Sequence, residues 1–147
     1  KTVDNNILQE IRSNNISKCT LEEQPWFNSL KYEKLSERFN IYKKINSIDT
    51  CYAHGDMGSE NIFLDKNNNV WIIDWEMANL FSPILTDELA YYLGLHNVEI
   101  NSLQNIEVHM DNFLSNHDKH NTIFALFYLD SLNYKPASNI IRFYINV

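Results

Sequence analysis

Residues 52–76 read Tyr-Ala-His-Gly-Asp-Met-Gly-Ser-Glu-Asn-Ile-Phe-Leu-Asp-Lys-Asn-Asn-Asn-Val-Trp-Ile-Ile-Asp-Trp-Glu. This stretch predicts a strand over 51–53, a polar loop over 54–60, and a β-hairpin with strands over 61–64 and 70–74. The turn between the hairpin strands is rich in Asn, which tolerates positive φ and therefore suits a tight reversal. The loop and hairpin thus occupy about 51–76.

Three polar side chains are placed by this backbone pattern. Asp56 and Asn61 lie at the two ends of the loop, and Asp74 ends the second strand of the hairpin. Because a hairpin folds its strand ends back on each other, we expect Asp74 to return to the neighbourhood of Asn61. Phosphoryl transfer uses one carboxylate to orient the attacking hydroxyl, and it uses a carboxylate and an amide oxygen to hold Mg²⁺. The spacing Asp56-x-x-x-x-Asn61, with His54 two residues ahead, is that of the kinase catalytic loop.

Two separated elements match one known superfamily in order and spacing: His54-Gly55-Asp56-(x)4-Asn61 and Ile73-Asp74-Trp75-Glu76. They resemble the aminoglycoside phosphotransferase and choline kinase superfamily, which shares the protein-kinase fold. The resemblance implies that Asp56 is the catalytic base and that Asn61 and Asp74 hold Mg²⁺, with ATP or GTP as phosphate donor. It also implies supporting roles for His54, which would brace the loop, and for Glu76.

The helix that follows the hairpin departs from the family pattern. Members of the superfamily carry Asp-Leu-Ala there, and its Asp braces the catalytic loop from below. This chain has Asp87-Glu88-Leu89-Ala90 instead. Either Glu88 substitutes for that Asp, or Asp87 takes its role with a shifted register.

The residues before the motif have apolar side chains at helical spacing, which predicts helices over about 4–47. A short amphipathic helix is expected over 4–13. Thr20 with Glu23 reads as a capping box for a second helix that runs to residue 47, with Pro25 in or near its first turn. We therefore expect no strands before residue 50.

After the motif, residues 78–83 are expected to be a connection, and Thr86 is expected to cap the next helix. The predicted helices of this part run over about 86–95, 101–116, 118–132 and 138–146. Residues 1–147 are thus expected to form a single domain, mainly α with a small β-hairpin. This α+β fold resembles the C-terminal lobe of a kinase-like enzyme.

Length, composition and charge limit the classes of function. The 147 residues are enough for one domain with a buried core, and the hydrophobic share of 44% is that of a globular protein. The net charge of −7 argues against a nucleic-acid partner, because no basic stripe is present to neutralise phosphates. The same charge is compatible with a cationic substrate such as an aminoglycoside or choline.

The remaining reactive residues show no further motif. Cys19 and Cys51 have no metal-ligand or redox spacing and are expected to be reduced thiols. His117 and His120 lie three residues apart, but no third ligand is implied, so we expect a polar surface there. No apolar run approaches a membrane span and no signal peptide opens the chain, so a cytoplasmic location without a membrane partner is expected.

A kinase-like enzyme holds its nucleotide between two lobes, and the N-terminal lobe supplies a sheet, a phosphate loop and a Lys–Glu pair. With only three glycines, the chain contains no glycine-rich phosphate loop. We therefore expect it to be the C-terminal part of a longer phosphotransferase, whose N-terminal nucleotide lobe lies outside this sequence.

Two hypotheses for the function follow. In the first, the parent enzyme phosphorylates a hydroxyl of a small molecule: an aminoglycoside, choline or ethanolamine, a homoserine-like metabolite or a sugar-like compound. In the second, the domain is a non-catalytic kinase-fold module for binding or scaffolding. The presence of all three motif side chains favours the enzyme. The acceptor and the choice between ATP and GTP stay open.

Overall fold

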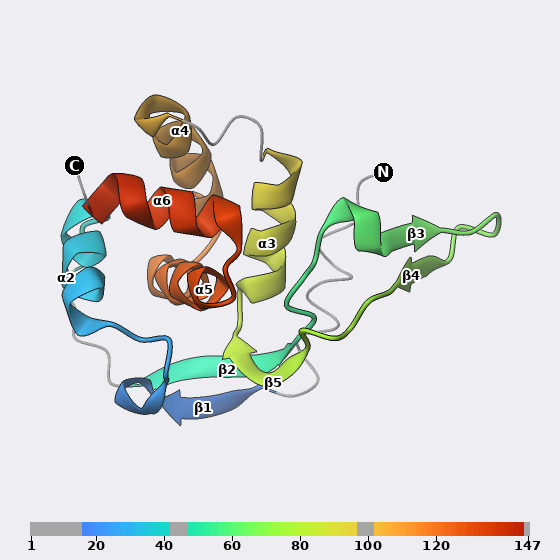
Figure 1. Ribbon diagram of the computed structural model, residues 1–147, viewed down its shortest axis with the longest axis horizontal. Helices are drawn as coiled ribbons and strands as arrows, with labels where there is room; N and C mark the ends of the chain where they lie inside the picture. The colour runs from blue at the N-terminus through green and yellow to red at the C-terminus, as the bar shows by residue number, and fades with distance from the viewer. Residues whose placement is uncertain (1–15, 42–46, 97–101, 146–147) are drawn as a thin grey trace.

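The computed structural model describes residues 16–41, 47–96 and 102–145 of the chain (Figure 1). Within these ranges the fold is α+β, with five α-helices and two small antiparallel sheets. The expected fold class is therefore confirmed at that level. The short helix predicted over 4–13 lies outside the described residues.

A three-stranded sheet that we did not predict forms one side of the fold. Its strands are β1 (Ser17–Thr20), β2 (Ser47–Ala53) and β5 (Asn79–Pro83), in the order β1-β2-β5 with antiparallel pairing. The expectations of no strand before residue 50 and of a connection over 78–83 are both wrong. The strands have four to seven residues and β1 is mostly exposed, so the alternation of apolar and polar residues that marks a strand is too short to recognise in the sequence.

The long helix predicted to end at residue 47 is a shorter one, α2 (Ser29–Arg38). Thr20 does not cap it, because Thr20 ends β1 and precedes a 3₁₀ turn, η1 (Leu21–Glu23), without a side-chain cap hydrogen bond. The cap is Asn28, whose side-chain oxygen accepts a hydrogen bond from the Lys31 N–H at 3.0 Å. Asn40, with φ of 57°, follows the helix in the left-handed conformation that often ends helices.

The C-terminal half consists of helices near their predicted positions: α3 (Thr86–Leu95), α4 (Leu103–Leu114), α5 (Lys119–Ser131) and α6 (Lys135–Ile145). Thr86 begins α3 as expected, but its hydroxyl donates to the Pro83 carbonyl at 2.7 Å instead of capping the helix. Helix α6 begins three residues earlier than predicted and takes Pro136 into its first turn, where the missing N–H costs no hydrogen bond.

Helix α5 lies at the centre of the molecule, between the three-stranded sheet and α6 (Figure 1). Every residue from 122 to 129 is buried, so this helix has no solvated face there. Helices α3 and α6 pack against it and form with it the larger of two hydrophobic clusters, while its Phe124 packs with Leu21 and Ile48 in the smaller one.

The predicted hairpin is confirmed as β3 (Ile62–Leu64) paired with β4 (Val70–Ile72), and it projects away from the helices (Figure 1). Asn68 has φ of 63° in its turn, which agrees with the reason given for an Asn-rich reversal. Ile62 is 2% exposed and joins the core, so the base of the hairpin is fixed while its tip lies in solvent.

Neither Cys19 nor Cys51 forms a disulfide, and Cys51 is buried in β2 as expected. None of the helices in the described part of the chain is both long and apolar enough to cross a bilayer.

Candidate functional site

The loop between β2 and β3 brings Asp56 and Asn61 together. The Asn61 side-chain amide donates to the Asp56 backbone carbonyl at 2.9 Å and to Asp56 Oδ2 at 3.3 Å. Asn61 is buried and Asp56 is half-buried. The amide thus holds one oxygen of the Asp56 carboxylate in place, while the residue stays accessible to a ligand.

His54 ties this loop to the hairpin. Its Nδ1 accepts a hydrogen bond from the Asp56 N–H at 3.1 Å, so the ring proton is assigned to Nε2, which donates to the Ile73 carbonyl at 2.7 Å. The ring is fully buried and neutral in this arrangement. His54 therefore positions the loop through these two hydrogen bonds and places no positive charge beside the Asp56 carboxylate.

Of the two candidates for bracing the loop from below, Asp87 makes hydrogen bonds to its backbone. Asp87 Oδ2 accepts from the His54 N–H at 2.8 Å, and Oδ1 accepts from the Gly55 N–H at 3.0 Å. Burial raises the pKa of Asp87, and the hydrogen bonds from the two amides offset only part of that rise. A buried carboxylate at the start of α3 thus fixes the backbone immediately before Asp56.

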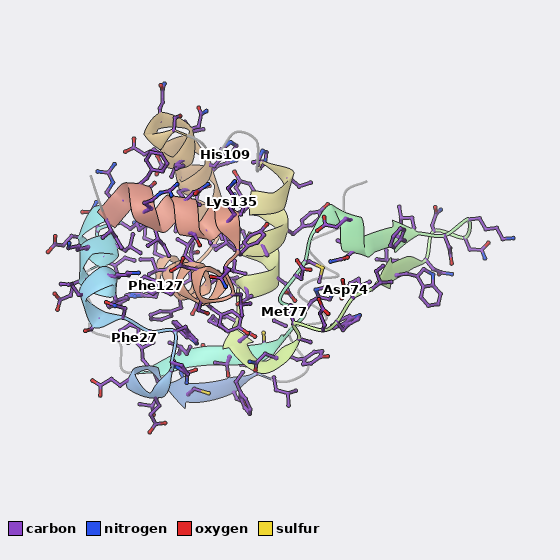
Figure 2. All side chains as sticks on the ribbon, in the orientation of Figure 1. Phe27, Asp74, Met77, His109, Phe127 and Lys135 are labelled. Carbon is purple, nitrogen blue, oxygen red and sulfur yellow. The ribbon has the colours of Figure 1, made fainter. Side chains whose placement is uncertain are left out.

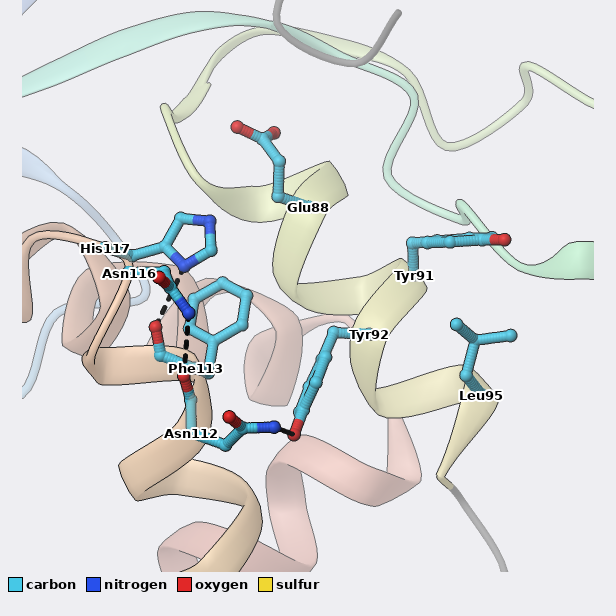
Figure 3. Close-up of a pocket in the computed structure, with 8 residues that line it drawn as sticks. All are labelled: Glu88, Tyr91, Tyr92, Leu95, Asn112, Phe113, Asn116 and His117. Carbon is cyan, nitrogen blue, oxygen red and sulfur yellow. Dashed lines mark hydrogen bonds between the residues drawn. The ribbon is translucent and has the colours of Figure 1, made fainter. Parts of the chain in front are cut away.

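Glu88 lies beside a separate cavity of about 250 Å³ between α3 and α4 (Figure 3). The rest of its wall is aromatic and polar: Tyr91, Tyr92, Leu95, Asn112, Phe113, Asn116 and His117. The Asn112 side-chain amide donates to the Tyr92 hydroxyl at 3.2 Å. None of these residues is within the loop or the hairpin that carries the predicted site.

His117 and His120 do not form the polar surface that we expected. Both are half-buried, and each has its own protein partner. The His117 ring stacks on Phe113 with centroids 3.9 Å apart, and its Nδ1–H donates to the Phe113 carbonyl at 2.9 Å. His120 Nδ1 lies 3.2 Å from the Tyr32 hydroxyl.

Asp74 follows β4 at the base of the hairpin, in the stretch that leads back to β5 (Figure 2). The Ile73 N–H donates to the Asn61 carbonyl at 2.9 Å, so the residue before Asp74 is paired with Asn61 as the hairpin argument predicted. Asp74 has φ of 62°, a left-handed conformation that is uncommon outside Gly and Asn and that recurs at functional sites. Its side chain is exposed.

Glu76 is also exposed, and no hydrogen bond or ion pair joins it to another residue within the described ranges. Within the described residues, no contact of Glu76 therefore supports the role that the resemblance implied for it.

Trp75 packs against Tyr52 and His54, contacts that the motif did not reveal. Its ring stacks on Tyr52 with centroids 5.8 Å apart and meets His54 edge-on at 4.7 Å. The indole N–H donates to the Ile72 carbonyl at 2.8 Å. The sequence did contain a signal for this contact, because an aromatic residue lies close to each half of the motif: Tyr52 near His54 and Trp75 next to Asp74.

A cavity of about 290 Å³ opens beside Asp56. The loop supplies one wall and the ends of α3 and α6 supply the other: Asp56, Gly58, Glu60, Gly94, Tyr134, Lys135 and Pro136. The Tyr134 hydroxyl donates to the Ala90 carbonyl at 2.8 Å. Burial raises the pKa of Tyr134 to about 12, with the negative charges of Glu60 and Asp56 adding to the effect.

The donor atoms of Asn61 and Asp74 fit Mg²⁺. The side-chain nitrogen of Asn61 donates to Asp56, so the side-chain oxygen of Asn61 is the group that can face a ligand. Amide and carboxylate oxygens are hard donors of the kind Mg²⁺ prefers, and this ion usually keeps several waters. Over the residues that the structure describes, no group of three or more His, Cys, Asp or Glu side chains forms a metal cage. The predicted magnesium site has two oxygen ligands, from Asn61 and Asp74, which is fewer than the three side chains that such a group requires.

No family model, curated protein or solved structure matches this chain. Its function therefore has to be argued from the geometry of the loop, the hairpin and the cavity beside Asp56.

Proposed function

We propose that this chain is the catalytic-lobe portion of an ATP- or GTP-dependent phosphotransferase that phosphorylates a hydroxyl of a small molecule. The observation that carries the proposal is the contact between Asp56 and Asn61 on a loop braced by both His54 and Asp87. An ordinary turn has no need of a buried histidine and a buried carboxylate to hold its backbone. Such support is typical of groups that must be positioned for chemistry.

Asp56 is the general base of this proposal. Its carboxylate lines the cavity where an acceptor would lie, and Asn61 restrains one of its oxygens. A carboxylate in this position orients the acceptor hydroxyl and takes its proton as the oxygen attacks the phosphoryl group. Phosphoryl transfer depends mainly on such positioning and on charge stabilisation, so a single fixed carboxylate is a sufficient base.

Asn61 and Asp74 would hold Mg²⁺ in the complex with nucleotide. The ion would supply neutralisation of the charge on the phosphates. The left-handed backbone at Asp74 supports this assignment, because it turns the chain sharply at the residue that follows the Asn61 partner. Asp74 and Asn61 thus come from two segments that the hairpin ladder joins.

The proposal includes a second, nucleotide-binding lobe of the same protein, as in the aminoglycoside phosphotransferases and choline kinases that the motif resembles. One face of the hairpin supports it. Phe63 pairs with Trp71 across the two strands and Ile73 follows on the same face, and these side chains are 44%, 59% and 45% exposed. Large exposed apolar side chains that cluster in this way mark contact surfaces.

The first test is calorimetric titration of the longest form of the protein that the gene encodes, with ATP and with GTP, in the presence and absence of Mg²⁺. We expect nucleotide binding that requires Mg²⁺ and that weakens at least about tenfold in Asp74→Asn, because one oxygen ligand loses its charge. Asp111→Asn, a change of an exposed carboxylate on α4, is the matched control and should bind as the unchanged protein does.

The second part of the test separates the enzyme from the binding module. Asp56→Asn should lower turnover about 10²–10⁴-fold while leaving Mg²⁺-dependent nucleotide binding unchanged. Equal nucleotide affinity in Asp74→Asn and the unchanged protein would contradict the metal assignment. Mg²⁺-dependent binding without transfer to any hydroxyl compound would favour the non-catalytic kinase-fold module.

A further inference from the structure

The cavity beside Asp56 carries charges of both signs on different walls. Asp56 and Glu60 belong to the loop, whereas Lys135 belongs to the first turn of α6, at the position labelled in Figure 2. The sequence motif gave no reason to bring Lys135 here, because α6 is far from the loop along the chain.

Glu60 places a second carboxylate at the loop wall. Its oxygens lie over Gly58, where a Cβ atom would come within 2.4 Å of them, so the missing side chain at Gly58 makes room for this carboxylate. Burial is the main cause of the raised pKa of Tyr134, and the negative charges of Glu60 and Asp56 add to it. If Asp56 is reserved for the acceptor hydroxyl, Glu60 is available to bind an ammonium group.

Lys135 is the positive group of the cavity. No ion pair joins it to another residue of the described ranges, where the lysine and arginine pairs are Lys18–Asp49 and Arg38–Glu107. Lys135 therefore shares the cavity with two carboxylates without being neutralised by either in a direct contact. An ammonium on a flexible stem is suited to binding a carboxylate as a point charge.

The other walls limit the size of the ligand. The Tyr134 hydroxyl is engaged with the Ala90 carbonyl, and a Cβ at Gly94 would lie 3.2 Å from that hydroxyl, so this side is closely packed. The volume of about 290 Å³ lies just below the range of roughly 300–1,000 Å³ that is usual for ligand pockets. It fits a molecule of amino-acid size better than a sugar of several rings.

We infer that the acceptor of the proposed phosphotransferase is a small hydroxy amino acid, with Lys135 binding its carboxylate, Glu60 its ammonium group and Asp56 its hydroxyl. This inference rests on the proposed function and names its substrate class. In the reaction, the acceptor oxygen forms a bond to the γ-phosphorus as the bond from that phosphorus to the β,γ-bridging oxygen breaks. The hydroxyl proton passes to Asp56, and the nucleoside diphosphate leaves with the bridging oxygen.

The test compares acceptors that differ by one charged group. L-homoserine has all three groups, 3-aminopropan-1-ol is the same skeleton without the carboxylate, and 4-hydroxybutanoate lacks the ammonium. L-serine and ethanolamine form a shorter pair. Release of nucleoside diphosphate is measured for each with the full-length protein, Mg²⁺ and ATP or GTP. We expect a hydroxy amino acid to be used with a kcat/KM at least about tenfold above that of its partner without the carboxylate.

Variants assign this preference to residues. Lys135→Met should remove the advantage of the hydroxy amino acid and leave the amino alcohol unaffected, while Lys135→Arg should keep most of it. Glu60→Gln should lower the use of both compounds that carry an ammonium. Lys66→Met, at the exposed hairpin turn, is the matched control and should change nothing. Thermal unfolding of each variant identifies any loss that comes from folding.

The outcomes separate this inference from the proposed function. Asp56-dependent transfer to amino alcohols, aminoglycosides or sugars, but to no hydroxy amino acid, would overturn the inference and leave the phosphotransferase standing. An equal effect of Lys135→Met on L-homoserine and 3-aminopropan-1-ol would also overturn it. If no hydroxyl compound is phosphorylated, both fall together.

Discussion

Gly55 adopts a backbone conformation that other residues avoid, and it does so next to the proposed base. Its φ is 86°, and a Cβ atom there would lie 2.5 Å from the Met77 carbonyl oxygen. Gly55→Ala is therefore expected to lower the free energy of unfolding by more than about 1–2 kcal/mol, the cost of the left-handed region alone, because the Met77 backbone must also move. Urea unfolding followed by tryptophan fluorescence measures this loss.

Gly58 is the matched control in the same loop. A Cβ atom there meets only the carboxylate of Glu60, at the end of a flexible side chain, so Gly58→Ala can be accommodated when that side chain moves. We expect a change in unfolding free energy of less than about 0.5 kcal/mol. Equal losses for the two variants would mean that the loop is not packed against Met77 in the way the structure describes.

Single residues differ in how well the sequence predicts their position. Asp56 and Asn61 lie together, and the residue before Asp74 pairs with Asn61, because a short loop and a hairpin with local pairing fix these separations. Tyr134 and Lys135 reach the same cavity through the packing of α6, which depends on contacts among distant helices and leaves no local pattern. Local geometry thus predicts the proposed catalytic and metal groups, but not the opposite wall of the cavity.

The hairpin is held at its turn by one exposed carboxylate. Asp65 accepts hydrogen bonds from the backbone N–H groups of Asn67 and Asn69 at 2.8 and 2.9 Å, and from the Trp71 indole at 3.1 Å. These bonds hold the pKa of Asp65 at about 2, with the Trp71 indole as the largest cause. Because the folded-state pKa is below the unfolded one, this stabilisation is complete above about pH 4 and is lost as the pH falls through about 2.

The expected result is a hairpin that loosens as Asp65 becomes protonated in acid. Trp71 fluorescence should change in acid with a midpoint near pH 2 in the unchanged protein, and Asp65→Ala should show the loosened signal already at pH 7. Lys66→Ala, one residue on, serves as control because its side chain is exposed in the same turn. An Asp65→Ala hairpin that keeps the unchanged Trp71 signal would show that the turn is stable without this carboxylate.

Among the elements, those with strong periodicity were predicted well and short strands were not. The amphipathic pattern of α4 and the apolar sequence of α5 gave bounds that agree with the structure to within about two residues. The strand β5 was read as a connection because its two exposed apolar residues, Leu80 and Phe81, are adjacent and do not alternate. Its pairing with β2 joins Thr50 to Pro83 and Cys51 to Ser82, residues more than thirty positions apart, and no window of local pattern contains both partners.

At the scale of the molecule, Asp87 joins the proposed site to the helical body. It lies in the first turn of α3, which packs on the central helix, and its carboxylate holds the backbone of His54 and Gly55. Asp87→Asn replaces one accepting oxygen by an NH₂ group that faces a backbone N–H. We expect the free energy of unfolding at pH 7 to fall by about 1–3 kcal/mol, the cost of a buried donor left unpaired.

The pH dependence of stability distinguishes this link from general damage to the core. Burial raises the folded-state pKa of Asp87, so the folded protein keeps that proton to a higher pH than the unfolded chain does, and its contribution to stability declines as the pH rises from about 4 toward the folded-state pKa. Asp87→Asn should remove this decline. Urea unfolding at intervals from pH 3.5 to 8 measures it.

Glu88→Gln makes the same chemical change at the neighbouring buried position, which lies beside the other cavity. It should leave Mg²⁺-dependent nucleotide binding unchanged, whereas Asp87→Asn should weaken that binding because the backbone before Asp56 loses one of its supports. If the two variants weaken nucleotide binding equally, the effect comes from the stability of α3 as a whole. The specific bond between this helix and the loop would then have no part in holding the site.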